Sequence, residues 1–338
     1  MQEVLSAPAN PSSVHSFGRA AKKILEDARA TLAQAISVFP NEIIFTASAT
    51  EANAMALRGV ADRRVLVSAT EHSSVLKHGK ATIPVHGNGR IDFEELEKIL
   101  ADSAPALVSV MLANNETGLI QPIHEVAALC KRYDALLHCD AVQGLGKIPV
   151  DFGKLGVDMM TVSSHKCGGP VGAAALVVRR KLAVEPLLIG GGQELNRRAG
   201  TENVAAIAGF AKAVELVDLK QMENLRGRLQ NMESGMKMHK GEIVSESFTR
   251  LANTTCVIMP GVTGEVQLMN FDLAGFAVSA GSACSSGRIE PSHVLLAMHM
   301  PKEKASCAIR ISGGWGTTEK DISGFLECWK ETCARLAK

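Results

Sequence analysis

The chain has 338 residues, of which 46% are hydrophobic and 21% are charged, and 36 Lys and Arg nearly balance 35 Asp and Glu. The resulting formal charge of +1 gives no electrostatic reason to expect a nucleic acid or a membrane as a partner. The composition is that of a soluble globular protein, long enough for one large and one smaller domain. The first twenty residues lack the basic start and apolar centre of a secretion signal, so we expect a cytoplasmic protein.

From about residue 20 to residue 205, apolar runs alternate with segments of helical periodicity. Such alternation predicts right-handed βαβ units on a mostly parallel sheet, with ligands at the carboxyl ends of the strands. The predicted helices are Gly18–Val38, a segment after Thr50, Phe93–Ala101 and Ile123–Tyr133. The predicted strands are Glu42–Thr46, Arg64–Val67, Leu107–Ala113, Leu136–Cys139, Asp158–Ser163 and Ala173–Arg180.

After residue 204 the pattern changes to a long helical segment, Ala205–Met232. The strand-like pieces Ala252–Met259 and Gly275–Ser279 and a final helix, Glu319–Leu336, then predict a smaller α+β unit. The predicted domains are therefore residues 10–210 and residues 211–338.

The segment 159–172, MMTVSSHKCGGPVG, predicts a buried strand that ends directly before Lys166. Because this lysine directly follows a buried strand, we expect it to be only partly solvated, with a lowered pKa. The neutral amine that results is what Schiff-base chemistry needs. Ser163 and His165 alternate at the strand end and could both donate hydrogen bonds to a phosphate. The alternative is a solvated lysine in a turn.

A second apolar strand, in ALLHCDAVQ (135–143), runs directly into Asp140. A buried carboxylate needs a cationic or hydrogen-bonding partner, and a pyridoxal ring nitrogen would provide one. Gln143 follows three residues later and could donate a hydrogen bond to the phenolic oxygen of that ring. The alternative for Asp140 is an ordinary helix N-cap.

The segment 45–57, FTASATEANAMAL, predicts a strand, a turn of small residues and a helix that begins near Thr50. Backbone N–H groups at a helix N-terminus, together with the Thr50 hydroxyl, can hold a phosphate without a charged side chain. A Thr followed by Glu51 is also common at helices that bind nothing.

Cys284 lies in VSAGSACSSGRIEPSHV (278–294), where glycine and serine predict a mobile loop. A cysteine there should be exposed, and Arg288 should favour its thiolate. The alternative is an incidental surface cysteine. The other cysteines form no CxxC pair and no zinc-finger spacing, so we predict that most are buried hydrophobes, with no disulfide framework and no metal site belonging to the chain.

Taken together, these motifs resemble the class I cysteine desulfurases, which are pyridoxal-phosphate enzymes of the aspartate-aminotransferase fold. The resemblance runs from about Asn10 to the C-terminus. It is carried by NPSSVHSFGR (10–19), ATEHSSVL (69–76), NNETG (114–118), HCDAVQ (138–143), SSHK (163–166), GGGQE (190–194), RAGTEN (198–203), GSACSSG (281–287), EPSHVL (290–295) and AIRIS (308–312).

The resemblance implies an α/β fold with a mostly parallel, seven-stranded sheet, helices on both faces and a smaller α+β domain that carries the Cys284 loop. Lys166 resembles the lysine that binds pyridoxal phosphate and moves the substrate Cα proton. His72 resembles the histidine that stacks on the ring and takes part in proton transfer. Cys284 resembles the nucleophile that becomes a persulfide, and its sulfur could also contact an iron–sulfur cluster transiently.

The remaining implied contacts surround the cofactor and the substrate. Asp140 and Gln143 resemble the partners of the ring nitrogen and the phenolic oxygen. Asn115 and Arg310 resemble residues beside the substrate, with Arg310 holding its carboxylate and Asn115 also contacting the cofactor. The implied phosphate ligands are Ala49, Thr50, Ser163, His165 and, from a second subunit of a homodimer, Thr201.

The implied reaction converts L-cysteine to L-alanine and transfers sulfur to Cys284 and then to an acceptor or scaffold protein, as in iron–sulfur cluster assembly. The nine residues before Asn10, MQEVLSAPA, do not match the usual start of the family, which predicts a shortened or divergent N-terminus. Two alternatives remain open: a weakly active or inactive paralogue that binds a partner or carries sulfur, and another enzyme of this fold such as a selenocysteine lyase or an aminotransferase. Cys167, directly after Lys166, is unusual and could be sensitive to oxidation.

Overall fold

A computed structural model describes residues 1–7, 9–102, 105–283 and 289–336. The chain forms two compact units. The first unit comprises Met1–Ile83, Phe93–Leu112 and Pro122–Val217. The second unit comprises Pro84–Asp92, Ala113–Gln121 and Asp218–Lys338.

This division differs from the predicted boundary between residues 210 and 211, which falls inside a helix of the first unit. Two short segments from earlier in the chain also belong to the second unit. Gln121 Nε2 donates to the Gly89 carbonyl at 2.7 Å, and Leu119 forms an antiparallel bridge with Arg250. A single cut in the sequence cannot represent a unit whose strands and loops come from three separate stretches.

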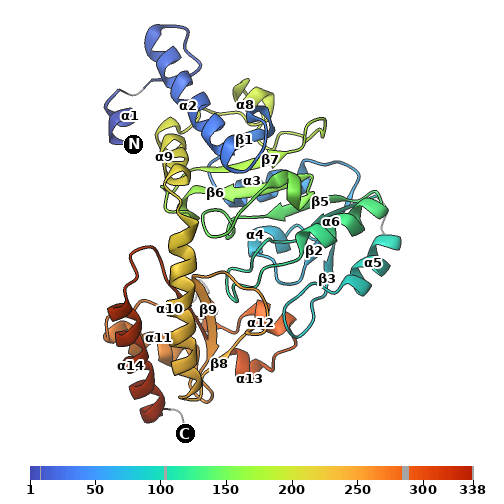
Figure 1. Cartoon of the computed structure of the whole chain (residues 1–338). Coiled ribbons are helices and arrows are strands. Elements are labelled where there is room, and N and C mark those ends of the chain that lie inside the picture. The colour runs from blue at the N-terminus through green and yellow to red at the C-terminus, as the bar shows by residue number, and fades with distance from the viewer. Residues whose placement is uncertain (8, 103–104, 284–288, 337–338) are drawn as a thin grey trace. The chain divides into compact units, whose positions relative to one another are not determined.

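The first unit contains most of the regular elements of the chain (Figure 1). Its strands are β1 (Ile43–Thr46), β2 (Arg64–Ser68), β3 (Ala81–Ile83), β4 (Ala106–Ser109), β5 (Leu136–Asp140), β6 (Met159–Ser163) and β7 (Ala174–Val178). Its helices are α1 (Gln2–Ser6), α2 (Ser16–Ala35), α3 (Ala49–Arg58), α4 (Ser73–Leu76), α5 (Phe93–Ala101), α6 (Ile123–Arg132), α7 (Phe152–Leu155), α8 (Gln193–Asn196) and α9 (Val204–Glu215), with the 3-10 turns η1 (Pro40–Glu42) and η2 (Ser164–Lys166).

The seven strands form one sheet in the order β1-β7-β6-β5-β4-β2-β3. The pairs from β6 to β3 are parallel, whereas β7 runs antiparallel to both of its neighbours. The expectation of a mostly parallel, seven-stranded sheet is confirmed. β4, β6 and β7 are buried along their whole length, which explains why they read as continuous apolar runs rather than as alternating ones.

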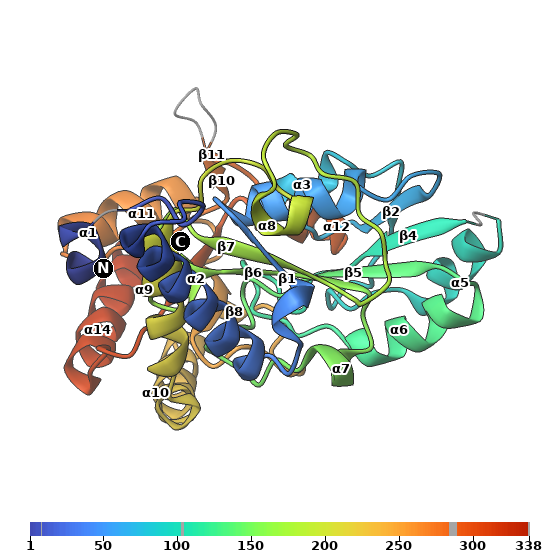
Figure 2. The same ribbon diagram turned by 90° about the horizontal axis from the view of Figure 1, so that it is seen from above.

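Helices cover both faces of this sheet, with α3 on one side and α6 on the other (Figure 2). Ala52, Met55 and Ala56 on the inner face of α3 pack in one cluster with side chains of β1, β2, β4, β6 and β7. Burial of that face fixes α3 against the middle of the sheet. It therefore positions the N-terminus of α3 relative to the strand ends.

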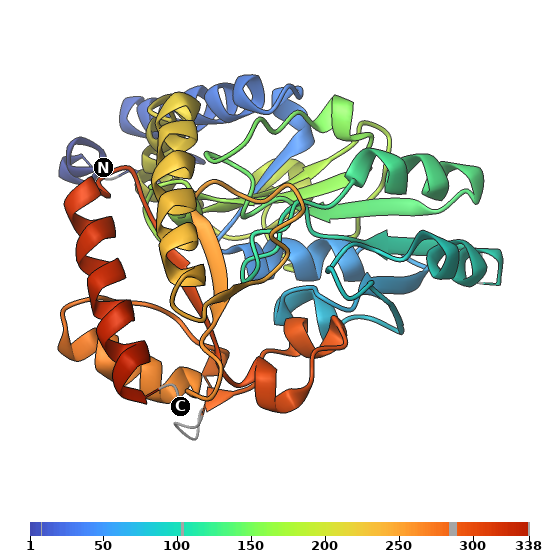
Figure 3. The same cartoon turned by 60° about the horizontal axis from the view of Figure 1, so that its bottom comes forward.

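The second unit contains the strands β8 (Glu242–Ile243), β9 (Thr254–Ile258), β10 (Ser282–Ala283), β11 (Ile289–Glu290) and β12 (Ala308–Ser312). Its helices are α10 (Leu219–Lys237), α11 (Gly264–Leu273), α12 (His293–Ala297), α13 (Lys302–Ala305) and α14 (Glu319–Leu336). The order β12-β9-β8 is antiparallel throughout, and β10 pairs with β11. Figure 3 shows α10 and α14 running side by side.

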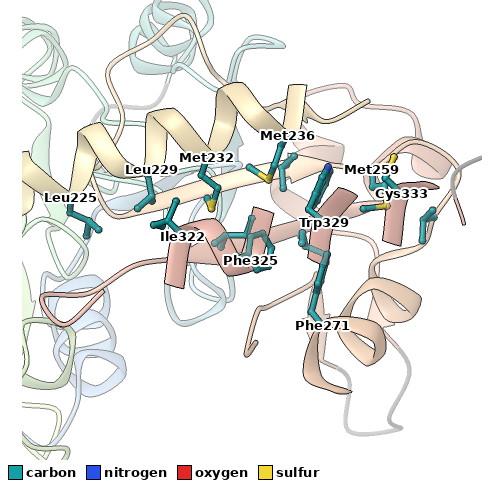
Figure 4. Close-up of a cluster of buried hydrophobic side chains, with 14 of the residues drawn as sticks. Leu225, Leu229, Met232, Met236, Met259, Phe271, Ile322, Phe325, Trp329 and Cys333 are labelled. Carbon is teal, nitrogen blue, oxygen red and sulfur yellow. The ribbon is translucent and has the colours of Figure 1, made fainter. Parts of the chain in front are cut away.

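A separate hydrophobic core lies between α10, α11 and α14 and one face of the small sheet. Trp329 is fully buried at its centre and stacks on Phe271 with 6.2 Å between ring centroids (Figure 4). Leu225, Leu229, Met232 and Met236, at helical spacing on α10, face the same cluster in Figure 4.

Two secondary-structure predictions are wrong. The segment Ala205–Met232 is two helices rather than one: α9 ends at Glu215, and Asp218 then caps α10 by accepting from the Lys220 amide at 2.9 Å. Within the described residues, Gly275–Ser279 is not a strand and makes a single bridge, from Ser279 to Arg310. Among the described residues, no helix combines the length and the apolarity that crossing a membrane requires.

Candidate functional site

The predicted site residues of the first unit gather where β5 and β6 end. Asp140 is the last residue of β5 and lies opposite Thr161 of β6, with which β5 is parallel. Ser163 ends β6, and the turn η2 then carries His165 and Lys166. The two strands therefore deliver Asp140 and the lysine turn to the same edge of the sheet, where parallel α/β proteins bind ligands.

Helix α3 begins beside this edge. It starts at Ala49, with the Ser48 hydroxyl accepting from the Glu51 amide at 3.2 Å, and Thr50 follows in the exposed first turn. One turn further on, Asn53 Nδ2 donates to Asp140 Oδ2 at 2.9 Å, which joins the start of the helix to the end of β5. The N–H groups of the first helical turn have no partner within the helix itself, so Ala49 and Thr50 can offer donors to an anion there.

Asp140 is almost completely buried, with 7% of its surface exposed. Burial raises the pKa of its carboxyl group, whereas hydrogen bonds from Asn53 and from the Val142 amide, and the charge of His72, lower that pKa. Each carboxylate oxygen accepts one of these bonds: Oδ2 from Asn53, and Oδ1 from Val142 at 3.0 Å. A carboxylate can accept further bonds, so capacity remains for a cationic N–H donor.

His72 is exposed and caps the short helix α4, while its neighbour Glu71 is completely buried. His72 Nδ1 accepts from the Ser74 amide at 3.2 Å and lies 2.8 Å from the Ser74 hydroxyl. Burial, and secondly the charge of Asp140, raise the pKa of Glu71 well above its usual range. Glu71 Oε1 accepts from the Met111 amide at 2.6 Å.

At the end of β6, Ser163 and His165 form a pair, with 3.0 Å between Ser163 Oγ and His165 Nδ1. Burial and the charge of Lys166 lower the pKa of His165. The expected partial burial of Lys166 is wrong for this chain, because Lys166 is exposed. The strand ends three residues earlier, and the turn η2 carries the lysine away from the core.

Gln143 and Thr201 complete the predicted contacts of the first unit. Lys147 Nζ donates to Gln143 Oε1, which leaves the NH₂ end of the Gln143 amide to face another acceptor. Thr201 is exposed in the loop before α9. Three residues earlier, Arg198 pairs with Glu51 at 2.7 Å and so ties this loop to the first turn of α3.

The two predicted substrate residues belong to the second unit. Arg310, on β12, donates through Nη1 to the Asn115 carbonyl at 2.9 Å and through Nη2 to the Ser279 hydroxyl at 3.0 Å. Its Nε is buried with no hydrogen-bond partner among the described residues. The guanidinium is thus fixed within its unit and still has an unused N–H donor.

Cys284 lies outside the described residues, and so does Arg288. Among the described cysteines, Cys328 is partly exposed and the others are buried, as expected. Cys167 is 1% exposed, and burial raises the pKa of its thiol to about 11. Its Sγ donates to the Ser164 carbonyl at 3.2 Å, so the expected sensitivity of Cys167 to oxidation is not supported. The described residues hold no group of three or more His, Cys, Asp or Glu that could bind a metal.

Sequence reasoning missed Asn53, Ser74 and Glu71. Asn53 is completely buried on the apolar face of α3. A polar side chain on that face was a signal in the sequence, because a buried amide needs partners. Its partners could not have been named, since Asp140 lies 87 residues away along the chain.

The donor set of the first unit fits pyridoxal phosphate. The buried Asp140 carboxylate suits a protonated ring nitrogen, because that cation would offset the cost of burying the charge. The first turn of α3 and the Ser163–His165 pair provide donors for a phosphate, and Lys166 provides the amine. The fold and this site define an α/β enzyme of the pyridoxal-phosphate class, of the aspartate-aminotransferase type.

A sequence model of the aminotransferase class-V family matches residues 1–325, and the chain belongs to this family. The cysteine desulfurase IscS of Dictyoglomus turgidum is 39% identical over 348 residues, covering 97% of this chain and 88% of that protein. The cysteine desulfurase IscS 1 of Archaeoglobus fulgidus is 38% identical over 347 residues, covering 97% of this chain and 90% of that protein.

Solved structures show the same relationship. The NifS-like protein of Rickettsia africae superimposes with a TM-score of 0.92 at 38% identity, covering 98% of this chain and 93% of that one. A second NifS-like protein gives a TM-score of 0.92 at 33% identity, covering 99% of this chain and 94% of that one.

Proposed function

We propose that this protein is a pyridoxal-phosphate-dependent cysteine desulfurase, which converts L-cysteine to L-alanine and passes the sulfur through Cys284 to an acceptor. The observation that carries the proposal is that buried Asp140, at the end of β5, and Lys166, just beyond the end of neighbouring β6, lie at the same edge of the sheet. Relatives named cysteine desulfurase, 38–39% identical over most of the chain, support the choice among reactions of this cofactor.

Each residue has a defined task in this reaction. Bound pyridoxal phosphate supplies an electron sink for negative charge at the substrate Cα. Asp140 keeps the ring nitrogen protonated, and Gln143 donates to the phenolic oxygen. Lys166 holds the cofactor and, once the substrate amine has displaced it, moves the Cα proton.

Arg310, Asn115 and Cys284 have the remaining tasks. Arg310 binds the substrate carboxylate, beside Asn115. The Cys284 thiolate attacks the substrate sulfur, so that a sulfur–sulfur bond forms while the substrate Cβ–S bond breaks. Protonation of Cβ then yields alanine, and the cysteine has become a persulfide. No external oxidant is needed, because the electron pair of the broken Cβ–S bond stays on Cβ, where it takes up the proton, while the sulfur becomes the outer atom of the persulfide.

We further propose a homodimer in which Thr201 reaches the phosphate of the other subunit's site. The first unit exposes large apolar side chains, including Phe17 at 70%, Val171 at 78% and Ile189 at 89%, which a second copy could cover. A light-scattering mass of twice 35.8 kDa would support the dimer, and a mass of one chain at all concentrations would contradict it. Delivery of sulfur for iron–sulfur cluster assembly is part of this proposal, and a cytoplasmic location stays a prediction.

The test measures alanine and sulfide formed from L-cysteine by the cofactor-loaded protein in the presence of a thiol reductant. We expect equal amounts of the two products, with both lost in Lys166→Ala and nearly lost in Cys284→Ser. Consumption of L-cysteine at the full rate by Cys284→Ser, with the amine transferred and no sulfide released, would instead indicate an aminotransferase. No alanine from the cofactor-loaded wild type would favour an inactive paralogue, and a strong preference for selenocysteine would indicate a lyase of that amino acid.

A further inference from the structure

A chain of hydrogen bonds within the first unit connects His72 to Asp140. Asn53 Nδ2 donates to Asp140 Oδ2 at 2.9 Å and also to the Ser74 hydroxyl at 2.9 Å. Ser74 Oγ lies 2.8 Å from His72 Nδ1. The four side chains come from α3, from the end of β5 and from the segment around α4, which are far apart in the sequence.

The direction of each bond follows from the donors available. An amide NH₂ group has two hydrogens, and Asn53 uses one on Asp140 and one on Ser74. The Ser74 hydroxyl accepts from Asn53, so its own hydrogen is available for His72 Nδ1. The backbone N–H of Ser74 also points at His72 Nδ1, at 3.2 Å. Two donors therefore meet Nδ1, which must be an acceptor, and the proton of the neutral ring lies on Nε2.

The opposite tautomer would bring unfavourable contacts. A proton on His72 Nδ1 would point at the hydrogen of the Ser74 N–H. The hydrogen of the Ser74 hydroxyl would also have to rotate away, so that the hydroxyl oxygen could accept from Nδ1. The opposite orientation of the Asn53 amide would point its carbonyl at the Asp140 carboxylate, leaving a buried charge without that donor. The hydrogen bond to Asp140 and the hydrogen bonds to His72 thus restrict each other's direction.

We propose that Asn53, acting through Ser74, is a positioning residue that holds His72 with its proton on Nε2 and holds Asp140 as an oriented carboxylate. The significance of the two ends rests on the proposed function, in which Asp140 serves the ring nitrogen and His72 takes part in proton transfer. His72 then presents a proton at Nε2, the ring nitrogen that these hydrogen bonds do not use. The two hydrogen bonds of the Asn53 amide go to Asp140 and Ser74.

The test uses nitrogen NMR of histidine-labelled protein without cofactor, with the His72 signal assigned from His72→Gln. In the wild type we expect the Nε2–H tautomer to dominate. Ser74→Ala should raise the share of the Nδ1–H form, because the hydroxyl donor is lost. Asn53→Ala should do the same, whereas Ser73→Ala, at an exposed neighbouring position, should match the wild type.

Cofactor affinity distinguishes the effect of Asn53 on Asp140 from its effect on His72. Asn53→Ala should weaken pyridoxal-phosphate binding by roughly ten- to a hundred-fold, because a charge-assisted bond to Asp140 is lost. Ser74→Ala should leave that affinity within about threefold of the wild type, since Asn53 still reaches Asp140. A dominant Nδ1–H tautomer in the wild type, or unchanged signals and affinity in Asn53→Ala, would overturn the proposal.

These outcomes are independent of turnover. If Asn53→Ala fails to fold, the wild-type tautomer and Ser74→Ala still decide the question. A protein that shows the expected tautomer and affinity pattern but makes no alanine would refute the desulfurase and leave the positioning role intact. A protein that makes alanine but shows the Nδ1–H tautomer would refute the positioning role and leave the desulfurase proposal intact.

Discussion

The ion pair between Arg29 and Glu194 anchors the segment after β7 to the start of the sheet. Glu194 accepts from Arg29 Nη1 at 2.9 Å and Nη2 at 2.7 Å, and from the Phe45 amide at 2.8 Å. The Glu194 side chain is fully buried, and that of Arg29 is 9% exposed. Glu194→Ala therefore leaves both a buried cation and a buried N–H without their partner.

The expected loss is large. Removing one partner of a buried pair costs about 3–5 kcal/mol. An unpaired buried N–H costs a further ~1–3 kcal/mol, although Glu26, 3.1 Å from Arg29 Nε, offsets part of the first cost. We expect Glu194→Ala to lower the free energy of unfolding by about 4–6 kcal/mol, a large share of the ~5–15 kcal/mol typical of folded proteins.

Urea unfolding followed by circular dichroism measures this loss, and helix α2 supplies a control. Lys23 and Asp27 form a pair on the same helix whose side chains are 75% and 63% exposed, so Asp27→Ala should cost about 0.5 kcal/mol or less. Adding Arg29→Met to Glu194→Ala should restore part of the loss, because no unpaired charge remains. A loss below about 1 kcal/mol in Glu194→Ala would refute the reasoning.

Three other predictions concern buried groups. Burial lowers the pKa of His138 to about 3, so that this histidine is protonated in the unfolded chain but not in the folded one as pH falls below about 6.5. The free energy of unfolding should therefore fall by about 1.4 kcal/mol per pH unit down to pH 3, and urea titrations of His138→Gln should show a shallower fall. Burial raises the pKa of Glu71, so the folded state retains a proton that the unfolded state loses above about pH 4.3. Glu71→Gln should therefore gain stability relative to the wild type as pH rises, and a difference in the free energy of unfolding that does not change with pH would contradict this. Trp329→Ala should cost about 3–5 kcal/mol, since Trp329 is fully buried, whereas Trp315→Ala, at 46% exposure, should stay within about 0.5 kcal/mol in the same urea assay; equal losses would contradict the core assignment.

Local patterns predicted most of the sheet, but they missed β3 and extended the strand of β4 to Ala113, whereas it ends at Ser109. An apolar run that stops at a polar residue locates both a buried strand and its exit, as at Asp140 and Ser163. The helices Phe93–Ala101 and Glu319–Leu336 have the bounds that their periodicity predicts. These features depend on neighbours in sequence, which explains why they are readable there.

Features that depend on distant contacts were not readable. The segment Gly275–Ser279 is not a strand, and within the described residues its one bridge joins Ser279 to Arg310 of β12. The discontinuous second unit, and the bonds of Asn53 to β5 and to the segment around α4, likewise require the folded chain. Lys166 was expected to be partly buried from its strand, and the three-residue turn η2 decides otherwise.

The most direct test of the desulfurase proposal is mass spectrometry of Cys284 after the cofactor-loaded protein meets one equivalent of L-cysteine without reductant. The account predicts that one sulfur atom is added at Cys284, with alanine formed in equal amount, and that Lys166→Ala shows neither. Alanine without added sulfur on Cys284, or cofactor-loaded protein that leaves L-cysteine unchanged, would contradict it.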